Sequence, residues 1–192
     1  MPTSMETRSV SRSCQAALIN INLRWLHQAL ALLAKIDENV YATAPPVLSS
    51  YRVGAHVRHI LDFYHCFFKG LEGGRIDYDV RGRDRVVEVS RSAACIAIHA
   101  IIHCFEHCHS LRAGSNVLVR LENADSSGLE SNFMHSSIRR ELQALSSHTI
   151  HHFALIAVTL RLHGIAVDPE FGMAPSTLRF LASKSNASEE AA

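Results

Sequence analysis

Apolar side chains recur every three to four positions along four long stretches of this 192-residue chain, the spacing of an amphipathic α-helix. The stretches are residues 14–36, 51–71, 89–113 and 137–162. Pro45-Pro46 separates the first two, Gly73-Gly74 follows the second, and Gly164 follows the last, and all of these residues end or interrupt helices. The pattern therefore predicts four long helices.

The segments between and beyond these helices are predicted to be short. Residues 74–84 carry mixed charges and predict a connection without strands, whereas residues 117–122 and 131–136 are β-prone and predict a small two-stranded ribbon. Residues 175–181 predict a short final helix, and residues 1–12 and 184–192 predict flexible tails. The expected fold is all-α, an antiparallel four-helix bundle in one domain over residues 13–183, with the ribbon leaning on it.

Three histidines lie in the helix predicted over residues 137–162. His148 and His152 are four residues apart and therefore lie one turn apart on the same helix face. At about 100° per residue, His152 falls within the apolar arc, His148 at its edge and His151 well outside it. An HxxxH pair also occurs by chance on helix surfaces, so the pair alone is weak evidence for a metal site. A catalytic type of zinc site takes three protein ligands, and the third must come from another helix.

The helix predicted over residues 51–71 offers two candidates for that third ligand. The helical wheel places His56 closer to the apolar stripe than His59, and so favours His56 slightly. The wheel also places Arg58 and Asp62 away from the stripe, which predicts solvated charges. Glu141, on the last long helix, is likewise predicted to lie at the surface.

A second histidine series follows the helix predicted over residues 89–113. Cys95, His99, His103 and His107 form an i,i+4 ladder opposite the apolar face. A second metal site is one interpretation. A solvated face or a subunit contact is the interpretation we favour, because this face points away from the interior of a bundle.

Composition and charge exclude several classes of function. The net charge of +1 gives no electrostatic reason to expect a nucleic-acid partner, and charged residues or histidines interrupt every apolar run, which argues against a membrane span. The first 13 residues are polar, which indicates no signal peptide, and the odd number of five cysteines favours a reducing cytoplasm. The 13 histidines invite a metal-binding interpretation, although most of them are expected to have no such role.

Three segments, in this order and spacing, carry a resemblance to a known family. They are VGAHVRHILDFYHCFF, IDYDVRGRD and ELQALSSHTIHHFALIAVTLRLHGIAV, and the similarity extends over residues 16–182. The chain resembles the DinB/YfiT-like superfamily of metal-binding four-helix bundles. The resemblance implies a divalent metal, zinc or nickel, held by His59, His148 and His152. It thus disagrees with the wheel on the third ligand, and we take His59 while His56 stays the alternative.

The resemblance also implies what such a site does. Several relatives in the superfamily are thiol-dependent transferases or isomerases, so we expect a metal-dependent enzyme that transfers a low-molecular-weight thiol to a small electrophile. A metal at an open site lowers the pKa of a bound water or thiol. The alternative is a non-catalytic, stress-associated metal-binding bundle that acts as a dimer, and in either case a homodimer is expected.

Overall fold

The computed structural model describes residues 4–48, 51–108, 111, 116–120 and 132–189, with side chains between Cys14 and Lys184. The described chain is mostly helical, with a small sheet at one side. Its long helices are α1 (Ser4–Leu33), α3 (Val53–Leu71), α5 (Arg91–His107) and α6 (Ile138–Leu162). The remaining elements are α2 (Glu38–Ala42), α4 (Arg85–Val89), α7 (Pro175–Glu189), β1 (Arg75–Asp77), β2 (Asn116–Arg120) and β3 (Met134–Ser137).

Local sequence signals set the bounds of α6, the helix that carries the HxxxH pair. It begins after Ser137, whose extended backbone and hydroxyl form an N-cap that accepts a hydrogen bond from the Arg140 amide at 3.2 Å. It ends at Leu162, followed by the C-cap His163 and by Gly164, whose φ of +77° is a left-handed conformation that suits glycine.

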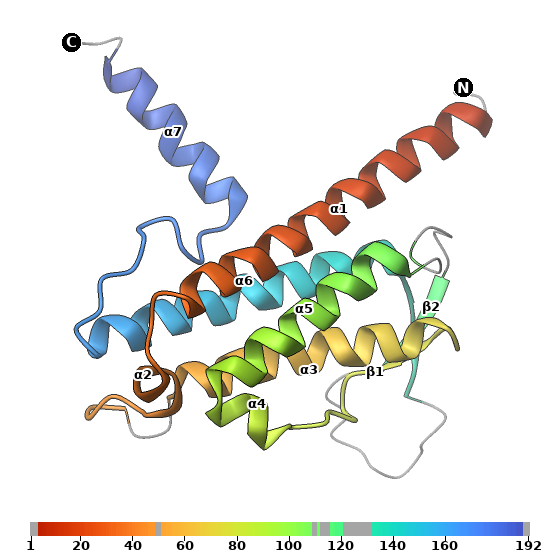
Figure 1. The fold of residues 1–192 in the computed structure, drawn as a ribbon. Helices are drawn as coiled ribbons and strands as arrows, with labels where there is room; N and C mark the ends of the chain where they lie inside the picture. Colours follow the sequence, from red (N-terminus) through yellow and green to blue (C-terminus); the bar gives the residue numbers. More distant parts are fainter. Residues whose placement is uncertain (1–3, 49–50, 109–110, 112–115, 121–131, 190–192) are drawn as a thin grey trace.

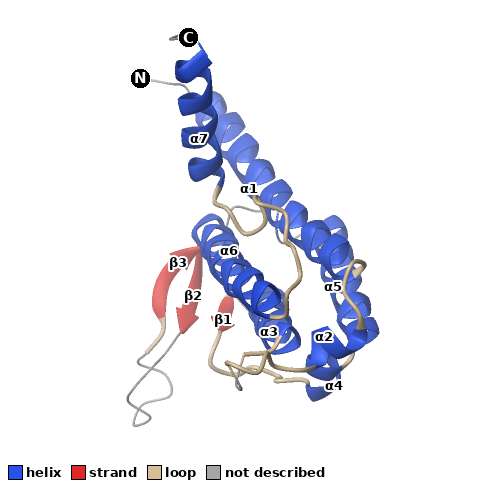
Figure 2. Ribbon diagram, turned by 90° about the vertical axis from the view of Figure 1, so that its left-hand side faces the viewer, coloured by secondary structure: helices blue, strands red, loops and turns tan. Residues whose placement is uncertain are grey.

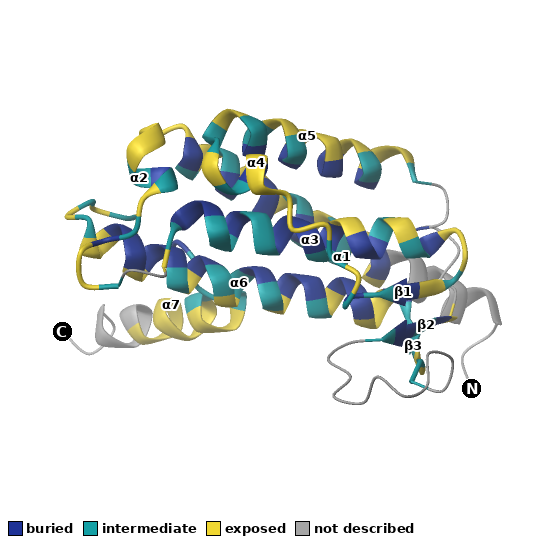
Figure 3. Cartoon of the chain, turned by 90° about the horizontal axis from the view of Figure 1, so that it is seen from below, coloured by how far each residue is buried: buried dark blue, intermediate teal, exposed yellow. Residues whose placement is uncertain are grey.

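The long helices pack in a closed ring in which α6 contacts α1 and α3, and α5 contacts the same two helices. Their apolar faces point inward and their outer faces are exposed, as Figure 3 shows. Fully buried aromatic and aliphatic side chains from every member of the ring form one core, among them Leu26, Tyr64, Phe67, Ile98, Leu142 and Phe153. Figure 1 shows α1 extending past the other helices at its N-terminal end, and α7 standing apart from them.

The sheet lies beside α6 and leads directly into it through β3 (Figure 2). Its order is β1-β2-β3, with β2 and β3 antiparallel and β1 parallel to β2. The predicted ribbon corresponds to β2 and β3, although its residues 121, 122 and 131 lie outside the described part of the chain. The prediction that residues 74–84 hold no strand was wrong, because β1 lies in this segment and pairs with β2. Its central residue, Ile76, is buried opposite Val119. A three-residue strand is too short to show alternation.

Other helix bounds also differ from those predicted. The stretch 89–113 is divided at Ser90, whose extended backbone ends α4 and caps α5. Helix α5 ends at His107, and residues 109–110 and 112–115 lie outside the described part. Helix also covers residues 4–12 and 184–189, where tails were expected, and neither segment contains a glycine or proline that would break it. None of the described helices combines the length and apolarity needed to cross a bilayer.

Candidate metal centre

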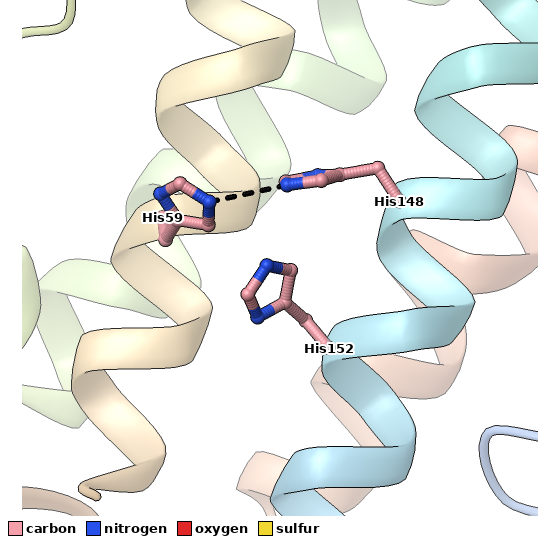
Figure 4. A group of neighbouring side chains, drawn as sticks. All are labelled: His59, His148 and His152. Carbon is pink, nitrogen blue, oxygen red and sulfur yellow. Dashed lines mark hydrogen bonds between the residues drawn. The ribbon is translucent and has the colours of Figure 1, made fainter. Parts of the chain in front are cut away.

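Three histidine rings from two helices converge on one point. His59 comes from α3, and His148 and His152 come from α6. One ring nitrogen from each lies within 4.8 Å of the other two. The Nε2 atoms of His59 and His148 are 3.1 Å apart (Figure 4). Imidazoles bound tetrahedrally to zinc at about 2.0–2.1 Å hold their nitrogens about 3.4 Å apart, so the spacing suits a shared cation.

A buried polar network beneath the cluster fixes the two helices against each other. The Tyr64 hydroxyl of α3 lies 3.2 Å from the Thr149 hydroxyl of α6, one residue after His148. Tyr64 also donates a hydrogen bond to Asn22 of α1 at 2.8 Å, and the Asn22 amide donates to the carbonyl of Leu142 in α6 at 3.0 Å. Because these groups are buried and satisfied, they define the register of α3 against α6.

His56, the alternative third ligand, lies beside the cluster but in a different position. Its Nδ1 is 3.1 Å from Nδ1 of His152. Figure 4 shows that one nitrogen of His152 points toward His59 and His148 while the other points away from them. His56 therefore contacts the outer nitrogen of His152. Its own Nε2 is buried and has no hydrogen-bond partner among the described residues.

Burial keeps the three converging rings neutral at physiological pH. It is the main cause that lowers the pKa of His59 to about 4, with the nearby Arg81 and Arg58 adding to the effect. Burial and then His59 lower the pKa of His148 to about 4. Burial and then His148 and His59 lower the pKa of His152 to about 2. Neutral imidazole is the form that binds a metal.

Positive charge borders the cluster on one side. The Arg81 guanidinium lies 3.4 Å from Nδ1 of His59 and 5.7 Å from the centre of the Phe63 ring. No acidic side chain in the described part of the chain forms an ion pair with Arg81. A cation beside the neutral rings favours an anionic group in the space that they share.

Arg58 and Asp62 are not the solvated charges that the wheel predicted. Asp62 is buried and pairs with Arg58 at 2.6 Å, and it accepts a hydrogen bond from the Arg83 amide at 3.1 Å. Arg58 also lies 3.4 Å from Glu88. The segment after β1 folds back over this face of α3 and covers it, which a wheel drawn for one helix cannot show.

A pocket of about 400 Å³ opens beside His148. Phe63 and His148 both line this pocket, and their rings stack with centroids 3.9 Å apart and planes inclined by 25°. Apolar and polar side chains line the rest, among them Tyr78, Ser136, Arg140, Glu141 and Leu145. The cavity is large enough for a small molecule.

The structure corrects the prediction for Glu141. This residue is buried and accepts hydrogen bonds from the hydroxyls of Tyr78, at 3.0 Å, and Ser136. The sheet covers the flank of α6 that carries Glu141, so this residue becomes part of the pocket wall. The segment IDYDVRGRD supplies Tyr78 and Arg81, and no periodic pattern in this segment indicates that either residue faces the last long helix.

The histidine ladder of α5 lies on the outside of the molecule. His99, His103 and His107 are exposed, and the Nδ1 atoms of His99 and His107 contact backbone carbonyls of α5 at 2.8 and 2.9 Å. The rings of His103 and His107 stack with centroids 4.0 Å apart. Among the described residues, these side chains do not form a converging ligand group.

Comparisons with known proteins add little to this geometry. No family model matches the chain, and no solved structure matches it. A curated protein described as "FK506-binding protein 5", from Rhizopus delemar, is 36% identical over 107 residues, which cover 55% of this chain and 27% of that protein. The chain thus spans about a quarter of the relative's length, and the match does not show a family.

Proposed function

We propose that this protein is a divalent-metal-binding member of the DinB/YfiT-like superfamily, with α1, α3, α5 and α6 as its antiparallel four-helix bundle. The closed ring of helix contacts supports this architecture. The positions of the histidines support it further, because the third ligand implied by the resemblance, His59, faces the HxxxH pair of α6.

The convergence of three neutral imidazoles carries the proposal. His59, His148 and His152 would hold the ion, and an all-imidazole set suits zinc or nickel better than calcium or magnesium. Three protein ligands leave a coordination position for water or substrate, as in catalytic zinc sites. The chemistry supplied by such an ion is the lowered pKa of a bound water or thiol.

The surroundings of the cluster support an enzyme that transfers a low-molecular-weight thiol to a small electrophile. In such a transfer the thiol loses its proton, its sulfur forms a bond to carbon, and the leaving group departs with the electron pair. Arg81, beside His59, would stabilise the thiolate, and Arg140 would contact an anionic group of a molecule in the pocket. Phe63 provides an apolar wall next to His148.

A non-catalytic metal-binding dimer is the second candidate, and it predicts a closed histidine cluster with a large helix interface. The pocket beside His148 favours the enzyme instead. A homodimer is compatible with the enzyme and with the non-catalytic protein. Sedimentation of the purified protein would measure its oligomeric state.

The primary test is the metal content of protein purified without a histidine tag. We expect close to one zinc or nickel ion per chain in the wild type and a large loss in His59→Ala and His148→Ala. His151→Ala is the matched control, because His151 is exposed on the same helix, between the two proposed ligands. Equal metal content in wild type and His148→Ala would refute the proposed site.

The second test concerns activity. The metal-loaded protein would be assayed with several low-molecular-weight thiols and an electrophilic acceptor, with and without a chelator. We expect thiol consumption that the chelator abolishes and that the metal restores. Transfer that is indifferent to the chelator would contradict metal activation, and metal binding without any transfer would favour the non-catalytic candidate.

A further inference from the structure

His56 is a polar residue beside the candidate metal centre that the proposed site does not use. It lies on α3 one turn before His59, and its ring is half-buried against His152, with centroids 5.3 Å apart. The two Nδ1 atoms are 3.1 Å apart, which is hydrogen-bond distance. A hydrogen bond between two neutral imidazoles requires one nitrogen to carry the proton and the other to accept it.

The direction of this hydrogen bond follows from the position of the cluster. His152 turns one nitrogen toward His59 and His148, and the nitrogen next to His56 is Nδ1, so Nε2 is the atom left for a cation. A neutral imidazole that binds a cation through Nε2 carries its proton on Nδ1. That proton then points at Nδ1 of His56, which must be the acceptor.

We propose that His56 is a positioning residue for His152, which accepts the Nδ1 proton of His152 and thereby holds Nε2 of that ring on the metal. The proposal rests on the proposed function. Metal-binding histidines almost always donate their second N–H to a carboxylate, a carbonyl or water. No described side chain other than His56 forms a hydrogen bond with His152, and an imidazole takes the place of the usual oxygen acceptor.

The neighbours of His56 are consistent with this role. Its Nε2 is buried without a hydrogen-bond partner among the described residues. Nδ1 is thus the nitrogen through which His56 contacts His152. No other described group fixes the tautomer of His56, so its proton can lie on Nε2 while Nδ1 accepts the hydrogen bond. The ring is also packed against Tyr51, with centroids 5.8 Å apart, which limits its rotation. His59 and His56, both on α3, thus take different roles: His59 would bind the ion directly, whereas His56 contacts His152, another proposed metal ligand.

The test compares zinc affinities, measured by competition with a chromophoric chelator, for two substitutions of His56. His56→Asn keeps a polar atom near the position of Nδ1, whereas His56→Leu removes the acceptor and keeps the volume. We expect zinc binding about 10- to 100-fold weaker in His56→Leu, the usual effect of losing such a partner. His56→Asn should restore most of the affinity. His65→Leu is the control, since His65 is exposed on the same helix, and it should bind as the wild type does.

A second measurement needs no substitution. In the zinc-loaded wild type, long-range ¹H–¹⁵N spectra of the histidine rings should show a proton on Nδ1 of His152 and a proton on Nε2 of His56. The cobalt-loaded His56→Leu protein should also show an altered visible absorption spectrum, because a reoriented His152 changes the ligand field. A purely structural role of His56 would leave that spectrum unchanged.

The possible outcomes separate this inference from the function on which it rests. If the wild type binds no zinc, both are refuted. If the wild type binds zinc through His148 but His56→Leu binds it equally tightly, only the role of His56 is refuted. Equal loss in His56→Leu and His56→Asn would indicate a packing role. A metal-shifted nitrogen on His56 would make it a ligand, and each of these results overturns the proposal.

Discussion

The polar side chains around the site are largely or partly buried. Their burial determines how they respond to substitution and to pH. Tyr78, Glu141 and the three converging histidines are all polar groups that folding removes largely or partly from water. The free-energy cost of burying each group is offset by hydrogen-bond partners, or it stays small because the group remains neutral.

The hydrogen bond from Tyr78 to Glu141 should contribute measurably to stability. Burial and then Glu141 raise the pKa of the Tyr78 hydroxyl, so it remains a donor at every ordinary pH. We expect Tyr78→Phe to lower the free energy of unfolding by about 1–3 kcal/mol, because a buried carboxylate loses one of its donors. Urea denaturation followed by the fluorescence of buried Trp25 measures this. Tyr51→Phe, at an exposed tyrosine, should have no effect. A Tyr78→Phe protein as stable as the wild type would refute the prediction.

The metal-free protein should lose stability as the pH falls from about 6.5 toward 4. In the folded state the pKa of His59 and of His148 is about 4, below the ordinary 6.5, so between these values the unfolded chain binds more protons. Stability consequently rises with pH across this window, by at most about 1.4 kcal/mol per pH unit for each ring. Partial exposure reduces that effect.

The measurement is the free energy of unfolding at several pH values in the presence of a chelator. His148→Leu removes one of the rings that resist protonation and should give a shallower slope between pH 4 and 6.5. His65→Leu, at an exposed position, should keep the slope of the wild type. A wild-type stability that is flat across this window would contradict the assigned cause.

At the scale of elements, helix α3 is the scaffold that joins the site to the sheet. It contacts α6 on one side and β1 on another, and the approach to β1 is close at Gly70. A Cβ atom built on Gly70 would lie 2.4 Å from the carbonyl oxygen of Arg75 and 2.7 Å from Cα of Ile76. The backbone of β1 fits against α3 only because this position has no side chain.

We expect Gly70→Ala to destabilise the protein by about 1–3 kcal/mol, because overpacking outweighs the better helix propensity of alanine. Gly73→Ala is the matched control, since nothing lies within 4 Å of a Cβ at that position and its φ is not positive. It should be neutral. Thermal unfolding of both variants measures the difference, and a Gly70→Ala protein that melts with the wild type would show that the two elements do not pack as described.

The predictability of these elements depended on how far the relevant contacts lie along the chain. The long helices and the facing of His148 and His152 follow from the periodicity of single segments, which a sequence displays directly. Strand β1 does not, because its pairing with β2 joins residues more than 40 positions apart, as Ile76 and Val119 show.

The errors in the candidate site have the same origin. Asp62 was predicted at the surface because it lies away from the apolar stripe of its own helix, and Glu141 was predicted there as a charged residue of the last long helix. Their burial comes from the segment after β1 and from the sheet, which the wheel does not include. His56 and His59 could not be ranked by the wheel, because both face α6 and only their contacts with particular nitrogens of His152 and His148 distinguish them.

At the scale of the whole molecule, a cation at the cluster would link two helices that are distant in sequence. His59 and His148 are 89 residues apart, and the elements between them include the helices α4 and α5 and the strand β2. A ligand that binds only the folded chain stabilises it by an amount that depends on its free concentration relative to its dissociation constant. The unfolded chain cannot present the three rings together, so the cation would bind only the folded chain.

Zinc should therefore raise the stability of the entire fold and not only that of the site. At a free concentration 100 times the dissociation constant, the expected gain is about 2.7 kcal/mol, which corresponds to an increase of about 5–11 °C in Tm for a chain of this size. Calorimetry of the wild type with buffered zinc and with a chelator measures the shift. His148→Leu should show almost none of it, whereas His151→Leu should show all of it. A shift of equal size in the His148→Leu protein would mean that zinc acts elsewhere, for example on the exposed histidines of α5, and that α3 and α6 are held together by their packing alone.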